Sequence, residues 1–333
     1  MEVINETNNK KIRSKQIPQL LKKYAIIFVL VGIIILFSIL SPYFLTVGNL
    51  TNVFVQQSYV IIAAVGLSFV MISGGMDLSI GWQMSLVGVV TATLMKNVGL
   101  PVYVSVAIGL LLGVFLGLFN GKMAVTLKVH PLIVTLGTMT AFQGLSYIAA
   151  NQSVILNLPD SFKFLGQGYL FNVIPVGVVL MAIVVVVASF ILNYTYFGRY
   201  IYAIGSNEEA AHLAGINVKK MKLMVFALGG LFAALASMVL FARTGSASPS
   251  TGPGTEFSCM TAAVLGGVSF KGGEGKVWGV VTGVLILGVL STGMQLIGMG
   301  TYAQYIVRGA VLLAAVGFDT YQKQSAAKVK KVA

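Results

Sequence analysis

Long apolar runs alternate with short polar segments along almost the whole chain, from residue 24 to residue 320. Ten of these runs approach or reach the roughly 20 residues that an α-helix needs to cross the hydrocarbon core of a bilayer. They lie near residues 24–40, 53–72, 78–95, 101–120, 131–150, 173–192, 222–242, 257–270, 277–297 and 302–320. The pattern therefore predicts an all-α fold, a polytopic transmembrane helical bundle of about ten spans.

The eighth run, at 257–270, is shorter than the others and contains the adjacent glycines Gly266 and Gly267. Irregular backbone at membrane depth is tolerated where protein or a water-filled cavity surrounds it. We therefore expect this run to form a short, broken or re-entrant helix.

The composition supports a membrane protein and excludes an ordinary soluble domain. Hydrophobic residues make up 57% of the 333 residues and charged residues only 9%, against about 25% charged residues in a typical soluble domain. The mean hydropathy is +0.90, and the 38 glycines suit helices that pack closely within lipid. The single cysteine, Cys259, excludes an intrachain disulfide and a thiolate metal cluster. We interpret it as a small buried hydrophobic residue.

The net charge of +13 is better explained by membrane topology than by nucleic-acid binding. The positive charges alternate with the apolar runs, and no nucleic-acid-binding motif accompanies them. A basic segment at 1–23 precedes the first run, which is longer than a signal-peptide core and lacks a cleavage site after it. We expect an uncleaved first helix and both chain ends in the cytoplasm, with a second basic segment at 321–333. Of the 22 lysines and arginines, 18 fall in the segments expected to be cytoplasmic and Arg308 lies within a span. The exceptions are Lys96, Lys163 and Arg243.

The most informative polar segment is the predicted cytoplasmic loop at 193–221. Ser206 and Glu209 have the spacing of a capping box, which predicts that a short helix starts at Asn207. Glu208 and Glu209 then lie in the first turn, where carboxylates suit the positive end of a helix.

Gly215 is placed to end this short helix as a C′ residue, with Ile216 after it, and Asn217 can cap the next helix. Apolar residues such as Ala210 and Ala211 leave much of the short helix unsuited to water. It is therefore either an interfacial helix resting on lipid headgroups or a docking helix for a soluble partner.

The segment from Glu209 to Gly215 resembles the coupling motif of bacterial ABC-importer permeases, E-A-A followed by three residues and glycine. Further segments resemble the ribose/galactose-type sugar permeases, which are related to branched-chain amino-acid permeases. These segments are Ser73–Gly81, Gly198–Asn207, Ala263–Ser269 and Gly272–Lys276. The resemblance extends from about residue 24 to residue 320, and its one departure is the doubled acid at Glu208 and Glu209.

This resemblance implies a transmembrane permease domain at 24–320 in a bacterial inner membrane, importing a ribose-, galactose- or xylose-like monosaccharide. It implies three protein partners within or beside the lipid bilayer: a separate ABC ATPase subunit, an extracytoplasmic sugar-binding protein and a second permease copy, identical or paralogous. ATP and magnesium would belong to the ATPase subunit, so no cofactor is expected on this chain. Nucleosides and branched-chain amino acids remain alternative substrates. The implied coupling residues are Ser206, Asn207, Glu208, Glu209, Ala210, Ala211, Gly215 and Ile216.

A second polar motif lies between the second and third runs, and contains Gly74, Gly75, Asp77 and Ser79. One interpretation is a helix cap, in which Asp77 or Ser79 accepts N–H bonds at the start of the third span. The other is a cytoplasmic gate or a second contact to the ATPase subunit.

Arg308 lies about two turns into the last run. A charge at the centre of a transmembrane helix costs about 2.5–3.5 kcal/mol on insertion scales. Arg308 is therefore expected to face protein or a pore, with Glu256 as a candidate partner. Structural pairing and lining of a substrate pathway both remain open.

Other chemistries find little support in the sequence. His130 and His212 have no neighbouring metal ligands, and no Walker-type nucleotide-binding motif occurs, so the energy for transport is expected from a partner. An ion-coupled secondary transporter usually places ionisable residues at mid-membrane, and an intramembrane enzyme needs a buried nucleophile and base. The sequence gives little support to either of these two alternatives.

Overall fold

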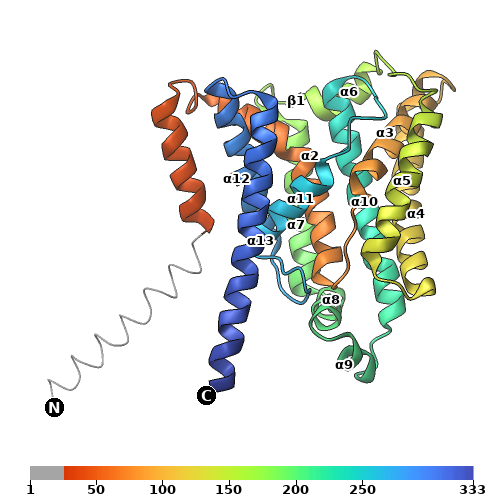
Figure 1. Cartoon of the computed structure of the whole chain (residues 1–333). Helices are drawn as coiled ribbons and strands as arrows, with labels where there is room; N and C mark the ends of the chain where they lie inside the picture. Colours follow the sequence, from red (N-terminus) through yellow and green to blue (C-terminus); the bar gives the residue numbers. More distant parts are fainter. Residues whose placement is uncertain (1–25, 333) are drawn as a thin grey trace.

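The computed structural model describes residues 26–332, and these form an almost entirely helical bundle (Figure 1). The predicted basic segment at 1–23 lies outside the described residues. The first helix is Ile26–Leu40. It is followed by α2 (Val47–Ile72), α3 (Ile80–Lys96), α4 (Val102–Leu127), α5 (Pro131–Ala149), α6 (Asp160–Gln167), β1 (Tyr169–Leu170), β2 (Ile174–Pro175), α7 (Val176–Tyr194), α8 (Tyr196–Ser206), α9 (Glu208–Leu213), α10 (Val218–Thr244), α11 (Thr255–Leu265), α12 (Val277–Leu296) and α13 (Thr301–Val332).

Six helices in the described part of the chain are long and apolar enough to cross a membrane: α2, α4, α5, α7, α10 and α12. The predicted all-α membrane bundle is thereby confirmed. A helix also occupies each of the other four predicted runs, but these four helices are not both long enough and apolar enough to be counted with the six. With 11 residues, α11 is about 16 Å long, roughly half of the hydrocarbon core, so the predicted short helix is confirmed.

The helix ends differ from the predicted spans in several places. α2 begins six residues before its apolar run and α4 continues to Leu127, because backbone hydrogen bonds carry a helix beyond the hydrocarbon core. For the same reason α13 passes through the boundary predicted at 320. The segment 151–172, which lies between the predicted runs 131–150 and 173–192, contains α6 and part of a small antiparallel β1–β2 hairpin.

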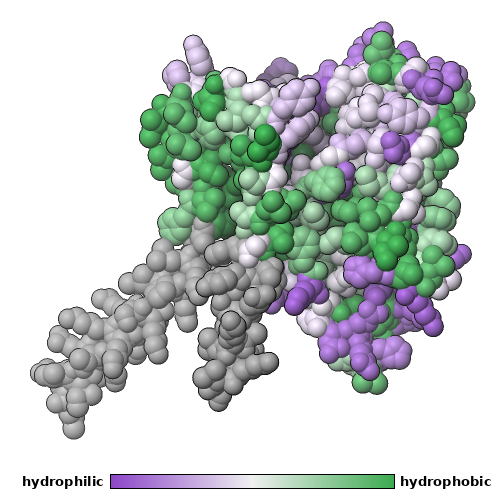
Figure 2. Space-filling view, viewed as in Figure 1, coloured by the Kyte–Doolittle hydropathy of each residue, from purple (hydrophilic) through white to green (hydrophobic). Residues whose placement is uncertain are grey.

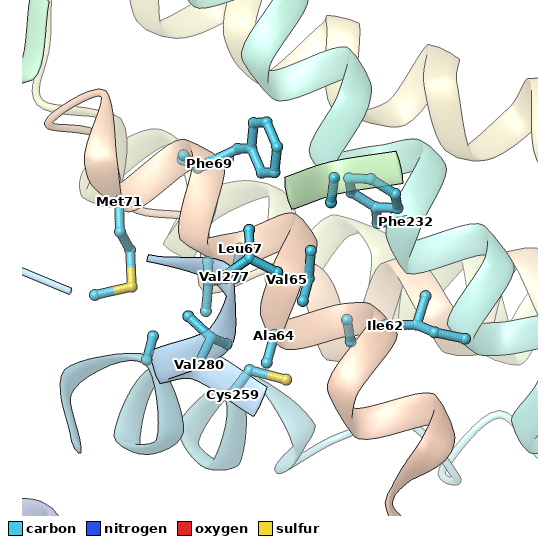
Figure 3. Packing of buried hydrophobic residues seen from close by; sticks show 14 of the residues in the cluster. Ile62, Ala64, Val65, Leu67, Phe69, Met71, Phe232, Cys259, Val277 and Val280 are labelled. Atoms are coloured by element: carbon cyan, nitrogen blue, oxygen red, sulfur yellow. The ribbon is translucent and has the colours of Figure 1, made fainter. Parts of the chain in front are cut away.

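The centre of the bundle is formed by α2 and α10, with α12 beside α2. Figure 3 shows Leu67 and Phe69 of α2 packing among Phe232 of α10, Cys259 of α11 and Val280 of α12, and all of these side chains are buried. Cys259 is fully buried, as expected for a small hydrophobic residue. The faces of α4, α5 and α7 are mostly exposed and apolar, as lipid contact requires.

The contact between α4 and α10 depends on small residues. A Cβ at Gly230 would overlap the carbonyl oxygen of Gly113, and one at Gly117 would overlap that of Phe226. Helices in lipid gain stability from such close backbone packing.

The two ends of the bundle carry different elements. α6 and the hairpin lie at one end, and α8 and α9 lie at the other, beyond the ends of α2, α4 and α5 (Figure 1). In Figure 2, hydrophilic residues gather at these two ends, and most strongly hydrophobic residues lie between them. This distribution is the one expected of a bundle that crosses a bilayer.

Candidate functional site

The start of α9 differs from the predicted capping box. Ser206 is the last residue of α8, and Asn207 is the N-cap of α9, where its Oδ1 accepts a hydrogen bond of 2.9 Å from the Ala210 N–H. The predicted box is therefore wrong, because the cap sits one residue later and moves Glu209 out of the position from which it could close the box. Glu208 and Glu209 do occupy the first turn, as predicted.

The end of α9 is the predicted left-handed glycine. Gly215 has φ +86°, and its N–H donates to the His212 carbonyl at 3.0 Å while the Ile216 N–H donates to the Ala211 carbonyl at 3.1 Å. These two bonds form a Schellman motif, which satisfies carbonyls at the helix end. Asn217 then caps α10 through a 3.0 Å bond from the Lys220 N–H to its Oδ1, also as predicted.

α9 presents an exposed tip at its end of the bundle. Ala211 is buried toward the bundle, whereas Leu213 is 81% exposed and Ala210, His212 and Ala214 are exposed as well. An ion pair of 2.6 Å between Glu208 Oε2 and Lys222 Nζ ties α9 to α10. α9 is therefore a short helix with defined ends, held by α10 and exposed on the side away from the bundle.

α8 was not predicted from the sequence. Its N-cap is Thr195, whose Oγ1 accepts from the Gly198 N–H at 3.3 Å. Ile201 and Ile204 face the bundle and are buried, while Tyr196 and Tyr200 are exposed. The predicted coupling loop at 193–221 therefore contains two helices, and α8 lies between α9 and the ends of the long helices (Figure 1).

The motif between α2 and α3 forms a buried polar cluster. Asp77 is 3% exposed and Ser79 is fully buried. Asp77 Oδ1 accepts from the Ser79 N–H at 2.9 Å and from its hydroxyl at 2.6 Å. The N–H that Asp77 accepts is that of Ser79, the N-cap residue of α3, and no side chain makes a cap hydrogen bond to the first turn of that helix. The predicted cap bond is therefore absent, and the Asp77 carboxylate lies within the buried cluster instead.

Two further members of this cluster were missed by the sequence analysis. Gln83 Nε2 donates to Asp77 Oδ2 at 2.9 Å and to Ser79 Oγ at 2.7 Å, and Asn120 Nδ2 of α4 donates to Ser79 Oγ at 2.8 Å. Thr135 of α5 accepts from the Leu78 N–H at 3.2 Å. The signal that could have found Gln83 and Asn120 is an amide side chain within an otherwise apolar run.

Arg308 lies on α13, half-buried against α12, where its Nη2 donates to Ser291 Oγ at 3.0 Å. The expected partner Glu256 is instead 1% exposed in the first turn of α11, with both carboxylate oxygens 3.0 Å from the Gly254 N–H. The pairing of Arg308 with Glu256 is therefore wrong: the tight turn before α11 holds the carboxylate within its own loop.

Arg308 borders a partly open cavity of about 550 Å³ that is lined by α2, α10, α11, α12, α13 and the loop before α11. This volume falls within the range of about 300–1,000 Å³ typical of small-molecule sites. The polar and aromatic residues of its wall are Gln56, Gln57, Tyr59, Arg243, Thr251, Thr255, Phe257, Ser258, Thr261, Ser291, Gln295, Tyr305 and Arg308.

The cavity wall is rich in hydrogen-bonding groups and, among the described residues, contains two cations and no acid. The Arg243 guanidinium lies 5.7 Å from the centre of the Tyr59 ring, and its Nε is buried without a hydrogen-bond partner. The described ion pairs, Lys163–Asp160 and Lys222–Glu208, involve neither arginine. Such a wall offers donors, amides, hydroxyls and aromatic faces to a polar solute.

The cavity lies in the half of the bundle away from α9. α10 starts directly after α9 at Val218 and reaches the cavity only with Arg243, in its last turn. The sequence analysis identified Arg243 only as a basic residue outside the expected cytoplasmic segments and did not predict this cavity. Its unusual position was the one sequence feature that could have pointed to the site.

These features define a multi-pass membrane protein with a polar cavity in one half and an exposed, separately capped helix at the opposite end. The chain belongs to the family described as branched-chain amino acid transport system / permease component, which it matches over residues 49–316.

Curated relatives cover nearly the whole chain. It is 37% identical over 321 residues to the ribose import permease protein RbsC of Haemophilus influenzae, covering 95% of this chain and 97% of the relative. It is 40% identical over 303 residues to the L-arabinose transport system permease protein AraH of Escherichia coli K12, covering 91% and 92%. It is 38% identical over 298 residues to the D-allose transport system permease protein AlsC of the same strain, covering 89% and 91%. No solved structure matches the chain.

Proposed function

We propose that this chain is the membrane-spanning permease subunit of an ATP-driven importer that moves an uncharged monosaccharide across a bacterial inner membrane. An extracytoplasmic binding protein delivers the sugar, and a separate ATPase subunit supplies the energy. The observation that carries the substrate class is the cavity wall, with two arginines, several amides and hydroxyls, and no acid among the described residues.

The same wall favours a sugar over a branched-chain amino acid. A zwitterion carries an ammonium group as well as a carboxylate, and a buried ammonium needs an anionic or strongly accepting partner. Arg243 and Arg308 would repel that ammonium at close range. A sugar hydroxyl can instead accept from the guanidinium groups of Arg243 and Arg308 and pack against an aromatic side chain of the wall such as Tyr59. The names of the ribose, arabinose and allose permeases among the relatives point in the same direction.

α9 is proposed as the docking helix for the ATPase subunit. Its capped ends and its exposed Leu213 support an insertion into a protein cleft. Two permeases, identical or paralogous, would pair with two ATPase domains, and closure of the ATPase pair would shift the permeases between outward-open and inward-open states.

Reconstitution into proteoliposomes with the ATPase subunit and binding protein encoded beside this chain tests the proposal. We expect ATP-dependent uptake of one radiolabelled pentose or hexose among D-ribose, L-arabinose and D-allose, and no uptake of L-leucine. Adenosine serves as the probe for the nucleoside alternative. If leucine or adenosine is taken up and none of the sugars is, the proposed monosaccharide substrate is wrong. Uptake without ATP would contradict the ATP-driven mechanism.

The proposed topology has ten spans with both termini in the cytoplasm, which places α8 and α9 in the cytoplasm as well. The distribution of basic residues supports it, because 18 of the 22 lysines and arginines fall in segments that this topology assigns to the cytoplasm. Single cysteines in a Cys259→Ala background provide the measurement. A membrane-impermeant thiol reagent added outside should label Ser161→Cys on α6 and leave Ser325→Cys unlabelled. The reverse pattern would invert the topology.

A further inference from the structure

Three sequence motifs that are far apart along the chain meet at one place beside α8. They are the end of α2 with Gly74, the end of α8 with Gly205, and the loop before α12 with Gly272 and Gly273. We call these four residues the glycine junction.

The contacts in the glycine junction are between backbones. The Gly273 N–H donates to the carbonyl of Ile72, the last residue of α2, at 2.8 Å. A Cβ at Gly205 would overlap that same Ile72 oxygen. A Cβ at Gly272 would lie 2.8 Å from Gly74 Cα and 2.9 Å from the Gly205 carbonyl oxygen. At these contacts the α8 end, the α2 end and the α12 loop touch backbone to backbone, and the one side-chain atom among the nearest neighbours of the four glycines that belongs to α8 is Ser206 Oγ, beside Gly273.

A side-chain hydrogen bond strengthens the same contact. The Tyr202 hydroxyl of α8 donates to the Gly275 carbonyl at 2.7 Å, which fixes α8 against the loop before α12. On its other side, the segment that follows Gly74 is held to α3, α4 and α5 by Asp77, Ser79 and Thr135. The junction thus joins α8 to two groups of long helices.

The helices that meet at the junction also line the cavity at their other ends or along their length. α2 contributes Gln56 and Tyr59, α11 contributes Ser258, and α12 contributes Ser291 and Gln295. α2 ends at the junction, while α11 leads into its loop and α12 begins after it. A displacement of α8 therefore has a rigid path to three walls of the cavity.

We infer that the glycine junction couples movement of α8 and α9 to the cavity, and that Gly205 is a positioning residue for transport. The physical reason is the absence of a compliant side chain, because backbone groups in van der Waals contact cannot absorb a shift by changing rotamer. Packed contacts of this kind pass a small displacement on to the elements behind them. This inference rests on the proposed function, since it assigns a route between the ATPase docking helix and the sugar pathway.

Gly205→Ala is the decisive variant. Gly205 lies within α8 and has no left-handed φ, so alanine raises the helix propensity of α8 while its methyl group pushes α8 away from Ile72. The matched control is Gly144→Ala on α5, where an added Cβ meets nothing within 4 Å. Tyr202→Phe is the milder second variant, since it removes only the hydroxyl that bonds Gly275.

The measurements use the reconstituted complex with its ATPase subunit and its sugar-loaded binding protein. We expect Gly205→Ala to keep the bound ATPase subunit and its basal ATP hydrolysis, and to lose about tenfold in sugar imported per ATP hydrolysed, a coupling loss within the usual range. Tyr202→Phe should lose about fivefold, the size expected for one hydrogen bond. Gly144→Ala should match the parent.

The outcomes separate this inference from the proposed function. A parent complex without ATP-dependent sugar uptake would contradict the proposed function itself. A normal parent with an unchanged import-to-hydrolysis ratio in both junction variants would overturn the junction, and so would loss of the ATPase subunit from them. If Gly205→Ala does not accumulate in the membrane, the ratio measured for Tyr202→Phe decides.

Discussion

Gly215→Val should abolish uptake while leaving the transmembrane bundle intact. Gly215 has φ +86° and an added Cβ there meets nothing within 4 Å, so the cost comes from the backbone rather than from a clash. A left-handed conformation costs a residue with a Cβ about 1–2 kcal/mol. Valine would open the two Schellman bonds to His212 and Ala211 and misdirect α9.

The measurement is a pull-down of the ATPase subunit by parent and variant at matched membrane levels, combined with sugar uptake. We expect both to fall to background. Gly215→Asn is the matched control, because asparagine enters the left-handed region more readily than other residues, and it should retain most of both activities. Equal recovery of the ATPase subunit with undiminished uptake by Gly215→Val would leave α9 as a helix that only rests on lipid headgroups.

Arg308→Leu should impair uptake at a different step. Arg308 reaches the cavity and donates to Ser291 Oγ at 3.0 Å. A hydrogen bond to a charged group contributes about 1.5–3 kcal/mol, so we expect uptake to fall about tenfold or more. Binding of the ATPase subunit should remain at the parental level, because the cavity lies in the half of the bundle away from α9.

Arg308→Lys is the control that keeps the charge but removes the planar fork of donors. It should show uptake between that of the parent and that of Arg308→Leu. If Arg308→Leu is as abundant as the parent and imports sugar at the parental rate, Arg308 is a surface residue whose charge reaches the headgroups, and its place in the pathway is disproved.

The features that the sequence predicted correctly are those that depend on residues close together along the chain. An apolar run within lipid must satisfy its backbone polar groups internally, so each run forms a helix and its position can be read from composition. The end of α9 at Gly215 and the cap at Asn217 were predictable for a related reason, since caps are satisfied within a few residues. The start of α9 was misplaced because Ser206 and Asn207 are adjacent N-cap residues of similar strength.

The tertiary structure decided which side chains face one another. Arg243, Tyr59 and Ser291 come from three helices, and the rotation of each helix about its axis, which packing sets, brings them to one cavity. Glu256 was a reasonable partner for Arg308 by charge alone, yet the turn at Gly254 directs its carboxylate elsewhere.

The sequence by itself therefore determined the class of protein, the apolar helices and the short helix α9 with its own cap and glycine end, because bilayer insertion and helix capping are local requirements. Only the tertiary structure decided that Gly74, Gly205 and Gly273 belong to one junction and that a polar cavity lies in the half opposite α9. A glycine in a sequence shows that a Cβ is absent. Which backbone fills that space depends on how distant helices pack.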